Sequence, residues 1–480
     1  MQKILNYING KLVEPASGKY IDNYNPSTGQ VYSLIADSDE RDVEEAVKAA
    51  DAAFPVWRAM SAQERSALLI KLSELIEKHL ERFAVAESVD NGKPVWLSRS
   101  VDIPRAVSNF HFYATAALHL STETHAMGDT ALNYTLRTPI GIAGCISPWN
   151  LPLYLFSWKI APALASGNCV VAKPSEITPM TAYLLSEMAI EAGIPAGVLN
   201  IVHGYGTKVG KAIVAHPKIQ AVSFTGGTKT GEEISRIAAP MFKKLSLELG
   251  GKNPNIIFAD CDFDKAVKTS VRSSFANQGE ICLCGSRMFV ERSIYDKFKS
   301  AFVAEVKKLK VGDPMDENNW LGAIVSKPHM EKILHYIELA KSEGGTVLTG
   351  GNRIHPGGLQ QDGYYIEPTV IEGLSYDCRT NQEEIFGPVV TMQPFDTEEE
   401  VLKYANSTTY GLAATVWSQH LTKAHRVAAR LHSGIVWVNC WLLRDLRTPF
   451  GGVKASGVGR EGGFEALKFF TEEKNVCIKL

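Results

Sequence analysis

Apolar positions recur along the chain with the spacing of buried strands and amphipathic helices. Four short apolar runs have the length and composition of buried strands: Ile142–Ile146, Cys169–Ala172, Leu199–Val202 and Ala221–Phe224. Segments with a helical pattern lie between them, including Thr178–Ala192 and Gly206–Ala215. Strands separated by helices of about ten to fifteen residues predict a doubly wound, parallel α/β domain. Sheets of this kind bind nucleotides at the carboxyl ends of their strands.

A second α/β series begins after Glu248. Its expected elements, in the order strand, helix, strand, helix, are Ile256–Phe258, Phe263–Asn277, Arg287–Val290 and Ile294–Leu309. Two α/β lobes therefore meet near residues 248–253, and we expect a cleft at their junction.

The remaining segments predict helices in the first third of the chain and two isolated strands. Two apolar stripes at helical spacing indicate helices packed on a core. The first stripe comprises Val43, Val47, Ala50 and Phe54, and the second comprises Leu69, Leu72, Ile76, Leu80 and Phe83. Ala131–Arg137, in which apolar and polar residues alternate, and the terminal Asn475–Leu480 fit neither lobe. We expect both to be strands that pair with another subunit.

The composition is that of a globular protein with two or three domains. The 480 residues are 45% hydrophobic and 21% charged, and the mean hydropathy is −0.06, which excludes a disordered chain, a collagen and a coiled coil. Lys and Arg number 50 against 52 Asp and Glu, a formal charge of −2. No net field therefore favours nucleic acid or anionic lipid as a partner.

Three further features concern localisation. The eight cysteines lack the spacing of a disulfide framework or a zinc site, which indicates a reducing cytosol. Met1–Gly10 lacks the apolar run and cleavage site of a secretory signal. Ile140–Ala172 contains one charged residue, Lys159, but its prolines and glycines would interrupt a spanning helix. We expect a cytoplasmic protein without a metal or a membrane partner.

Two side chains are candidates for covalent chemistry. Cys282 follows a glycine-containing turn, where its sulfur could project into a cleft as a thiolate nucleophile, although a cysteine is more often a small buried hydrophobe. Cys284 completes a Cys-x-Cys pair, but no second pair supports a metal site. Glu248 lies between two leucines, where a raised pKa would suit a general base, but a glutamate in this position more often faces solvent at a strand end.

These segments resemble the glutamate and cysteine signatures of the aldehyde dehydrogenase superfamily. The match runs from about Tyr7 to Leu480 and includes further motifs in order. They are Ser147-Pro148-Trp149-Asn150, Lys173-Pro174-Ser175-Glu176, Phe224-Thr225-Gly226-Gly227-Thr228, Glu383-Glu384-Ile385-Phe386-Gly387-Pro388 and Pro449-Phe450-Gly451-Gly452. Several ordered motifs with none missing are more specific than any one alone.

The resemblance implies a mechanism for this sequence. Cys282 should attack the aldehyde carbon, and the Asn150 amide and the backbone N–H of Cys282 should stabilise the resulting oxyanion. Asn150 could otherwise be a turn residue before Pro152. Hydride transfer should leave a thioester, and Glu248 should activate the water that hydrolyses it.

The resemblance also implies NAD as the cofactor. The sequence has no Gly-x-Gly-x-x-Gly motif, and its glycine-rich turns do not continue as a Walker motif. The residues expected around NAD are Ser147, Pro148, Trp149, Lys173, Ser175, Glu176, Gly206, Gly210, Phe224, Thr225, Gly226, Gly227, Leu249, Gly250, Glu384 and Phe386. Lys173 and Glu176 should hold the adenosine ribose, where a carboxylate disfavours the 2′-phosphate of NADP. Gly227 departs from the serine of many members, which puts one phosphate hydrogen bond in question.

The family implies an α/β fold with a Rossmann-type NAD-binding domain, an α/β catalytic domain and a small β oligomerisation element. We assign residues 1–118 and 139–248 to the NAD-binding domain and residues 249–450 to the catalytic domain. Residues 119–138 and 451–480 are assigned to the oligomerisation segments. A homodimer or homotetramer is expected.

Two arginines suggest an acidic aldehyde as the substrate. Arg105 and Arg444 lie in segments that should line the aldehyde tunnel with Phe450, and arginine binds carboxylate bidentately. Each arginine could instead pair with a neighbouring acid, Asp102 or Asp445. Both segments resemble those of the muconic semialdehyde dehydrogenases. The 2-aminomuconic members, which serve tryptophan degradation through kynurenine, are favoured, and the 2-hydroxymuconic members are the alternative. A coenzyme-A-acylating dehydrogenase and a catalytically silent protein on this fold stay open.

Overall fold

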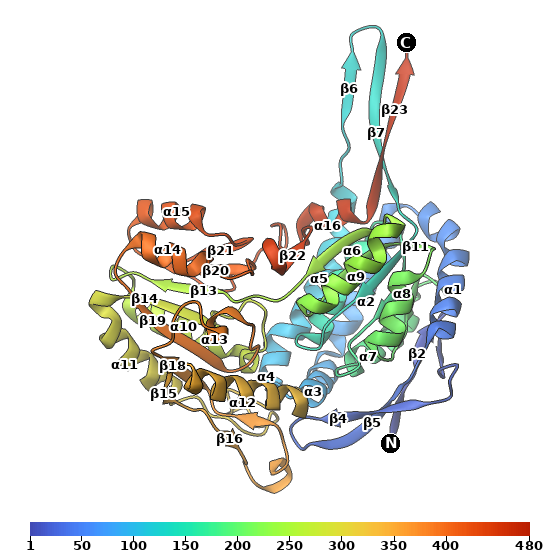
Figure 1. Ribbon diagram of the computed structural model, residues 1–480. Helices are drawn as coiled ribbons and strands as arrows, with labels where there is room; N and C mark the ends of the chain where they lie inside the picture. Colours follow the sequence, from blue (N-terminus) through green and yellow to red (C-terminus); the bar gives the residue numbers. More distant parts are fainter.

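The computed structural model describes residues 1–480 and consists of two α/β lobes and a projecting β arm (Figure 1). The first lobe is built on an eight-stranded sheet in the order β22-β12-β11-β8-β9-β10-β2-β3. Its strands are β2 (Asn6–Ile8), β3 (Lys11–Val13), β8 (Ile142–Ile146), β9 (Cys169–Lys173), β10 (Leu199–Ile201), β11 (Ile219–Thr225), β12 (Lys244–Glu248) and β22 (Gly457–Val458). The five strands from β12 to β10 are parallel, and their buried apolar residues form the largest core of the molecule.

The register of these parallel strands brings the nucleotide-binding motifs to one edge of the sheet. Ile146 pairs with Lys173 and with Phe224, and Thr225 pairs with Glu248. The motifs that follow these strand ends therefore lie side by side. This is the edge at which parallel α/β sheets bind their ligands.

The helices of the first lobe follow the predicted stripes, with one difference. They are α1 (Glu40–Ala59), α2 (Ala62–Lys78), α3 (Leu80–Asn91), α4 (Val95–Leu97), α5 (Ile103–Ala116), α6 (Pro152–Ala165), α7 (Met180–Ala192), α8 (Lys211–Ala215) and α9 (Thr228–Ala238). The stripe from Leu69 to Phe83 was expected on one helix but is divided between α2 and α3 at His79. A turn of π-helix, Gly206–Gly210, precedes α8.

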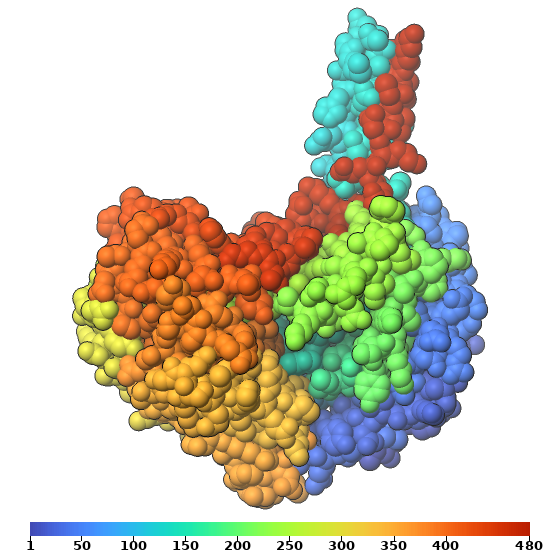
Figure 2. Space-filling model, in the orientation of Figure 1, coloured from blue at the N-terminus to red at the C-terminus, as the bar shows by residue number.

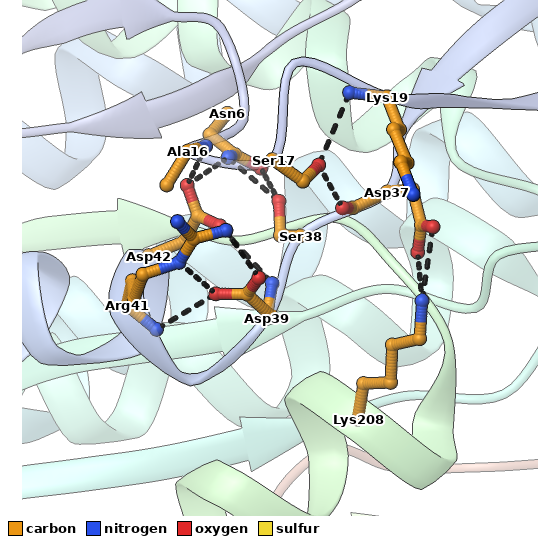
Figure 3. Close-up of polar contacts among 10 residues, drawn as sticks. All are labelled: Asn6, Ala16, Ser17, Lys19, Asp37, Ser38, Asp39, Arg41, Asp42 and Lys208. Atoms are coloured by element: carbon orange, nitrogen blue, oxygen red, sulfur yellow. Dashed lines mark hydrogen bonds and ion pairs between the residues drawn. The ribbon is translucent and has the colours of Figure 1, made fainter.

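A polar network fixes the start of α1 against the rest of the lobe (Figure 3). Asp39 caps the helix, and Asp42 accepts a hydrogen bond from the Ala16 N–H at 2.9 Å. Lys208, in the turn that begins at Gly206, pairs with Asp37 at 2.9 Å. The turn before α8 is thereby tied to the amino-terminal segment.

The second lobe is a seven-stranded sheet with helices packed on it. The strand order is β15-β18-β19-β14-β13-β20-β21, and only β15 is antiparallel to its neighbour. The strands are β13 (Pro254–Ile257), β14 (Arg287–Glu291), β15 (Thr346–Thr349), β18 (Thr369–Glu372), β19 (Val389–Phe395), β20 (Ala413–Trp417) and β21 (Ile435–Val438). The helices are α10 (Phe263–Phe275), α11 (Tyr295–Val306), α12 (Lys327–Ser342), α13 (Arg379–Gln382), α14 (Glu398–Asn406) and α15 (Leu421–Arg430).

The arm corrects one prediction about strand pairing. It consists of β6 (Thr124–Met127), β7 (Ala131–Pro139) and β23 (Thr471–Lys479), in the order β23-β7-β6, and stands away from both lobes (Figures 1 and 2). Ala131–Arg137 was expected to pair with another subunit, but it pairs with residues 473–479 of the same chain. Pairing of Asn475–Leu480 with another subunit through its other edge stays a prediction. Both edges of β7 are occupied within the chain, and only β23 and β6 present an open edge.

Smaller elements complete the fold. β1 (Gln2–Ile4), β4 (Tyr20–Asn25) and β5 (Gln30–Ala36) form a three-stranded sheet, β16 (Arg353–Ile354) and β17 (Tyr365–Ile366) form a pair, and α16 (Gly463–Phe469) leads into the arm. None of the helices combines the length and apolar character needed to cross a bilayer. The domain boundaries stay a prediction, but β22, from the segment assigned to oligomerisation, joins the first sheet.

Candidate active site

Two cavities meet at Cys282 in the junction between the lobes. The larger, about 390 Å³, is mainly apolar and leads to Cys282 from one side. The smaller, about 250 Å³, lies at the edge of the first sheet. Cys282, Thr225 and Leu249 line both cavities. A space-filling view shows the hollow between the lobes (Figure 2).

The loop that carries Cys282 is held in a constrained conformation. Helix α10 ends at Phe275, two residues before the predicted end, because Asn277 and Gln278 adopt left-handed φ values of 53° and 56°. Gly279 is also left-handed, and a Cβ there would lie 2.2 Å from the Gly387 carbonyl oxygen. A larger residue cannot occupy this position. The loop is therefore fixed against the second lobe.

Asn253 anchors the other side of the Cys282 loop. Its Nδ2 donates to the carbonyl oxygens of Cys282 and Cys284 at 2.7 and 2.9 Å. Sequence analysis placed Asn253 at the lobe junction without a function. The structure shows that it sets the backbone on which the sulfur sits.

Cys282 and Cys284 differ in surroundings. Burial, followed by the charge of Glu248 and of Glu384, raises the pKa of the Cys282 thiol above its ordinary value, and Arg444 opposes this shift. Cys284 packs among Ile281, Leu283 and other buried apolar residues, and burial raises its pKa to about 12. Cys282 alone of the two faces both the large and the small cavity.

Glu248 ends β12 at the wall of the larger cavity. It is 4% exposed, and its Oε1 has no hydrogen-bond partner. Burial and then the charge of Glu461 raise the pKa of its carboxyl group well above the ordinary value, while Lys159 opposes the shift. A Cβ on Gly451 would lie 2.9 Å from Glu248 Oε1, so a glycine at this position leaves room for the carboxyl group. A buried, unpartnered carboxyl beside Cys282 is suited to accept a proton.

A buried ion pair stands next to Glu248. Lys159 Nζ lies 2.8 Å from Glu461 Oε1 and 3.2 Å from Ser223 Oγ, which itself donates to Glu461 at 3.0 Å. Sequence analysis assigned no role to either residue. One feature of the sequence could have revealed Lys159, because it is the only charged residue in a long apolar stretch.

Asn150 offers hydrogen-bond donors beside the Cys282 loop. Its Nδ2 donates one hydrogen bond, to the Glu280 carbonyl oxygen at 2.9 Å, which leaves the second amide hydrogen without an acceptor in the protein. The backbone N–H of Cys282 makes no hydrogen bond either. Two unused donors near one sulfur fit the charge that develops on a carbonyl oxygen attacked by that sulfur.

The smaller cavity gathers part of the residue set predicted to bind a cofactor. Its lining comprises Pro148, Trp149, Asn150, Thr225, Gly226, Gly227, Leu249, Gly250, Cys282, His329, Lys332, Glu384 and Phe386. Ser147 Oγ, Thr225 Oγ1 and Thr228 Oγ1 are buried without partners. A Cβ on Gly227 would meet nothing within 4 Å, so this position leaves open space at the amino end of α9. Unsatisfied hydroxyls and a helix amino terminus suit the phosphates of a dinucleotide.

The other predicted cofactor residues lie at or after the ends of β9, β10 and β11. Lys173 pairs with Glu176 at 2.8 Å, and Glu176 accepts a hydrogen bond from the Gly206 N–H at 3.4 Å. A Cβ on Gly210 would meet the Lys173 chain. Ser175 Oγ accepts from the Ile177 N–H at 3.2 Å. Phe224 lies one residue before the end of β11, and its ring packs against Gly226.

The larger cavity contains an arginine without a carboxylate partner. Arg444 donates from Nη1 to the Tyr154 hydroxyl at 2.8 Å, and its guanidinium lies 4.0 Å from the centre of the Phe450 ring. Neither acid considered as a competing partner binds its arginine. Asp445 pairs with Arg447 at 2.6 Å, and Asp102 pairs with Lys93 at 2.5 Å.

Arg105 is not among the residues that line the cavity. Its guanidinium lies over the ring of Tyr154, 5.7 Å from the ring centre, so it reaches the wall only through that tyrosine. Arg272, which sequence analysis did not single out, does line the cavity and is exposed over the ring of Trp441 at 5.6 Å.

The sequence model of the family described as "Aldehyde dehydrogenase family" matches residues 12–476 of this chain. The chain belongs to the aldehyde dehydrogenase family. A 2-aminomuconic semialdehyde dehydrogenase of Homo sapiens is 51% identical over 477 residues, covering 99% of this chain and 98% of the relative. A 2-hydroxymuconic semialdehyde dehydrogenase of Pseudomonas sp. (strain CF600) is 47% identical, with 100% of both chains covered. A solved NAD⁺ complex of an aldehyde dehydrogenase from Bacillus cereus superposes with a TM-score of 0.97 at 42% identity, covering 100% of this chain and 97% of that one.

Family membership confirms the predicted α/β fold and the resemblance found in the sequence. Within the family site, sequence analysis missed residues that no short motif marks. His329 lies beside Phe386, with its Nε2 2.6 Å from the Phe386 carbonyl oxygen, and its ring packs 5.1 Å from that of Trp149. It reaches the site from α12, far along the chain from the motifs.

Proposed function

We propose that this chain oxidises 2-aminomuconic semialdehyde to 2-aminomuconate, with NAD as the hydride acceptor. The observation that carries the proposal is an arginine without a carboxylate partner, Arg444, in the cavity that leads to Cys282. Four relatives that are 51–53% identical over 477 residues bear the name of this activity.

The first half of the reaction uses Cys282 and Asn150. The Cys282 thiol loses its proton to water, and its sulfur bonds to the aldehyde carbon. The carbonyl oxygen becomes an oxyanion that accepts hydrogen bonds from the Asn150 amide and the Cys282 N–H. Removing one such donor typically slows catalysis by ~10²–10³-fold.

The residues of the smaller cavity fit NAD, which when bound supplies the acceptor for the hydride of the aldehyde carbon. Thr225 and the turn at Gly226–Gly227 would hold the pyrophosphate at the amino end of α9. Glu384, whose Oε1 is fixed by the Gly251 N–H at 2.8 Å, and Phe386 would contact the nicotinamide ribose and ring.

The second half of the reaction releases the acid. Glu248 takes a proton from a water molecule, whose oxygen attacks the thioester carbon, and the bond from carbon to the Cys282 sulfur then breaks. The Lys159–Glu461 pair lies next to Glu248 and sets how readily its carboxyl group ionises. A base at this position favours hydrolysis over transfer of the acyl group to coenzyme A.

Substrate choice rests on the charge at the far end of the aldehyde. Arg444 is half-buried between aromatic rings, where a charge-assisted bond to a carboxylate is stronger than at the surface. The 2-hydroxymuconic semialdehyde is the second candidate, because it carries the same remote carboxylate and a relative that is 47% identical is named for it.

The test is the formation of NADH by the purified chain. We expect turnover of 2-aminomuconic semialdehyde with NAD, unchanged by coenzyme A, and a lower kcat/KM for a neutral aldehyde of similar length. Cys282→Ala should abolish turnover while NAD binding, followed by calorimetry, survives, and Cys284→Ala is the matched control that keeps activity. Turnover that requires coenzyme A, or equal efficiency with the neutral aldehyde, would reject the proposal.

We also propose that the chain forms a homodimer or homotetramer in the cytosol. The arm leaves the open edge of β23 and exposed apolar side chains, among them Leu136 and Ile478. Such an edge pairs readily with a second copy. All eight cysteines are unpaired, which suits a reducing compartment. Sedimentation as a species of 52.6 kDa at micromolar concentration would contradict the assembly.

A further inference from the structure

A buried ionic cluster lies behind Asn150 and takes no part in the chemistry proposed above. It consists of Glu87, Lys93 and Asp102, each at most 1% exposed. Lys93 Nζ lies 2.5 Å from Asp102 Oδ2, 3.5 Å from Glu87 Oε1 and 3.0 Å from the carbonyl oxygen of Asn150. The three side chains come from α3, the turn after it and the segment before α5.

Stability alone does not explain this cluster. Burial of an ion pair often contributes less to folding than apolar residues of the same volume would. Burial also raises the pKa of the Glu87 carboxyl group to about 8, which disfavours a charge on it. Lys93 and Asp102 then form one cation facing one anion, and the third partner of the ammonium is the Asn150 carbonyl.

The contacts of Asn150 show what the cluster holds in place. Its carbonyl oxygen accepts from Lys93 and from Asn277 Nδ2, the latter at 3.1 Å. Its side-chain amide donates to the Glu280 carbonyl oxygen. The residue is thus fixed at both its backbone and its side chain. Glu87 Oε2 accepts from the Leu153 N–H at 3.1 Å, which fixes the start of α6 directly after Asn150.

We propose that Lys93 is a positioning residue for the oxyanion site, acting through the Asn150 carbonyl. The inference rests on the proposed function, in which the Asn150 amide stabilises the oxyanion. Such a donor is effective only where its geometry is set before the charge develops. A displacement of about 1 Å in a positioned group can cost ~10²-fold in rate. An ammonium bound to the carbonyl of Asn150 itself prevents that displacement without touching the substrate.

The test removes the cation without leaving a buried anion. Lys93→Met alone would strand the Asp102 carboxylate, which is strongly destabilising. The double variant Lys93→Met/Asp102→Asn removes both charges and is made with Asn150 present and in an Asn150→Ala background. The measured quantity is the rate of the single-turnover NADH burst, with NAD affinity and Tm followed in parallel.

We expect the double variant to slow the burst ~10–100-fold when Asn150 is present and less than about twofold when Asn150 is alanine, because the positioned amide is already gone. Glu87→Gln is the matched control. It keeps a neutral hydrogen-bonding group in the same cluster, and the burst should stay within about twofold of the parent. If the Met variant does not fold, Lys93→Gln/Asp102→Asn is used instead. It keeps a neutral donor, and its burst rate should lie between that of the parent and the rate expected for the Met variant.

Equal losses in the two backgrounds would overturn the inference, since Lys93 would then act independently of Asn150. An unchanged burst rate in the double variant with Asn150 present would also overturn the inference, because the cluster would then have only a structural role. The cycle is run with a neutral aldehyde in addition to the acidic semialdehyde. A failed choice of substrate is therefore visible in the parent enzyme and is distinct from a failed positioning role.

Discussion

Arg444 provides the sharpest test of substrate recognition. Arg444→Met removes the guanidinium but leaves an unbranched apolar chain against Phe450 and Trp158, so the aromatic wall keeps a neighbour. The hydrogen bond to the Tyr154 hydroxyl is lost, and that hydroxyl can turn to solvent in the cavity. The perturbation is therefore mainly a loss of charge.

The expected magnitude follows from the bond that is lost. A hydrogen bond to a charged group contributes ~1.5–3 kcal/mol, which corresponds to roughly 10- to 150-fold in kcat/KM. The assay compares kcat/KM for 2-aminomuconic semialdehyde and for a neutral aldehyde, with NAD saturating. The neutral aldehyde should change by less than about threefold, because it has no carboxylate for the guanidinium to hold.

Arg447→Met is the matched control in the same segment. Arg447 is exposed, pairs with Asp445 at 2.6 Å and does not line the cavity, so kcat/KM should be unchanged for both substrates. Arg105→Met should have a smaller effect than Arg444→Met, because Arg105 lies behind Tyr154. A uniform loss on both substrates in Arg444→Met would refute the reasoning and leave Arg444 as a support of the tunnel wall.

Four further predictions concern ionisation, acid release and cofactor choice. Because the pKa of the Cys282 thiol is raised, its alkylation by iodoacetamide should accelerate about tenfold per pH unit from about pH 7 to 9, and a plateau below about pH 8 would contradict this. Glu461→Gln removes the main electrostatic cause of the raised pKa of Glu248. Glu248 loses its proton-accepting form as pH falls through that pKa, so the acid limb of the kcat profile should move to lower pH, and an alkaline shift would be inconsistent. Glu248→Gln should keep a burst of NADH but stall before acid release, and the trapped thioester should appear by mass spectrometry. NAD should be preferred to NADP, and Glu176→Gln should narrow the difference in kcat/KM.

The parts of the fold and site predicted from sequence are those set by local pattern. The strands at Ile142–Ile146 and Cys169–Lys173 follow from unbroken apolar runs, and parallel pairing then places the motifs at their ends on one edge. Local pattern alone left Cys282 and Glu248 as weak candidates, and the resemblance of their motifs to the family signatures identified them. Each of these motifs can be recognised from a few adjacent residues, without knowledge of contacts to distant segments.

The parts that sequence could not provide depend on contacts between distant segments. The strands of the arm were recognised, but their partner was not, because alternation indicates a strand without saying which edge it meets. Arg105 and Arg444 look alike in sequence, yet only Arg444 lines the cavity, because Arg105 lies over the ring of Tyr154 whereas Arg444 binds its hydroxyl. Lys93 reads as a lysine in a Gly-Lys-Pro turn, and nothing adjacent to it in sequence reveals that it lies buried behind Asn150.

The electrostatics of the site order its two proton transfers. Glu248 raises the pKa of Cys282, and this repulsion between anions is mutual, so ionisation of one group opposes ionisation of the other. Before reaction, burial and this repulsion favour the neutral form of each group, and the charge of Arg444 opposes both shifts. Once the Cys282 sulfur is bonded to carbon it can no longer be an anion, and one obstacle to the ionisation of Glu248 disappears. The carboxylate that hydrolysis needs is therefore favoured at the stage when a thioester is present to be hydrolysed.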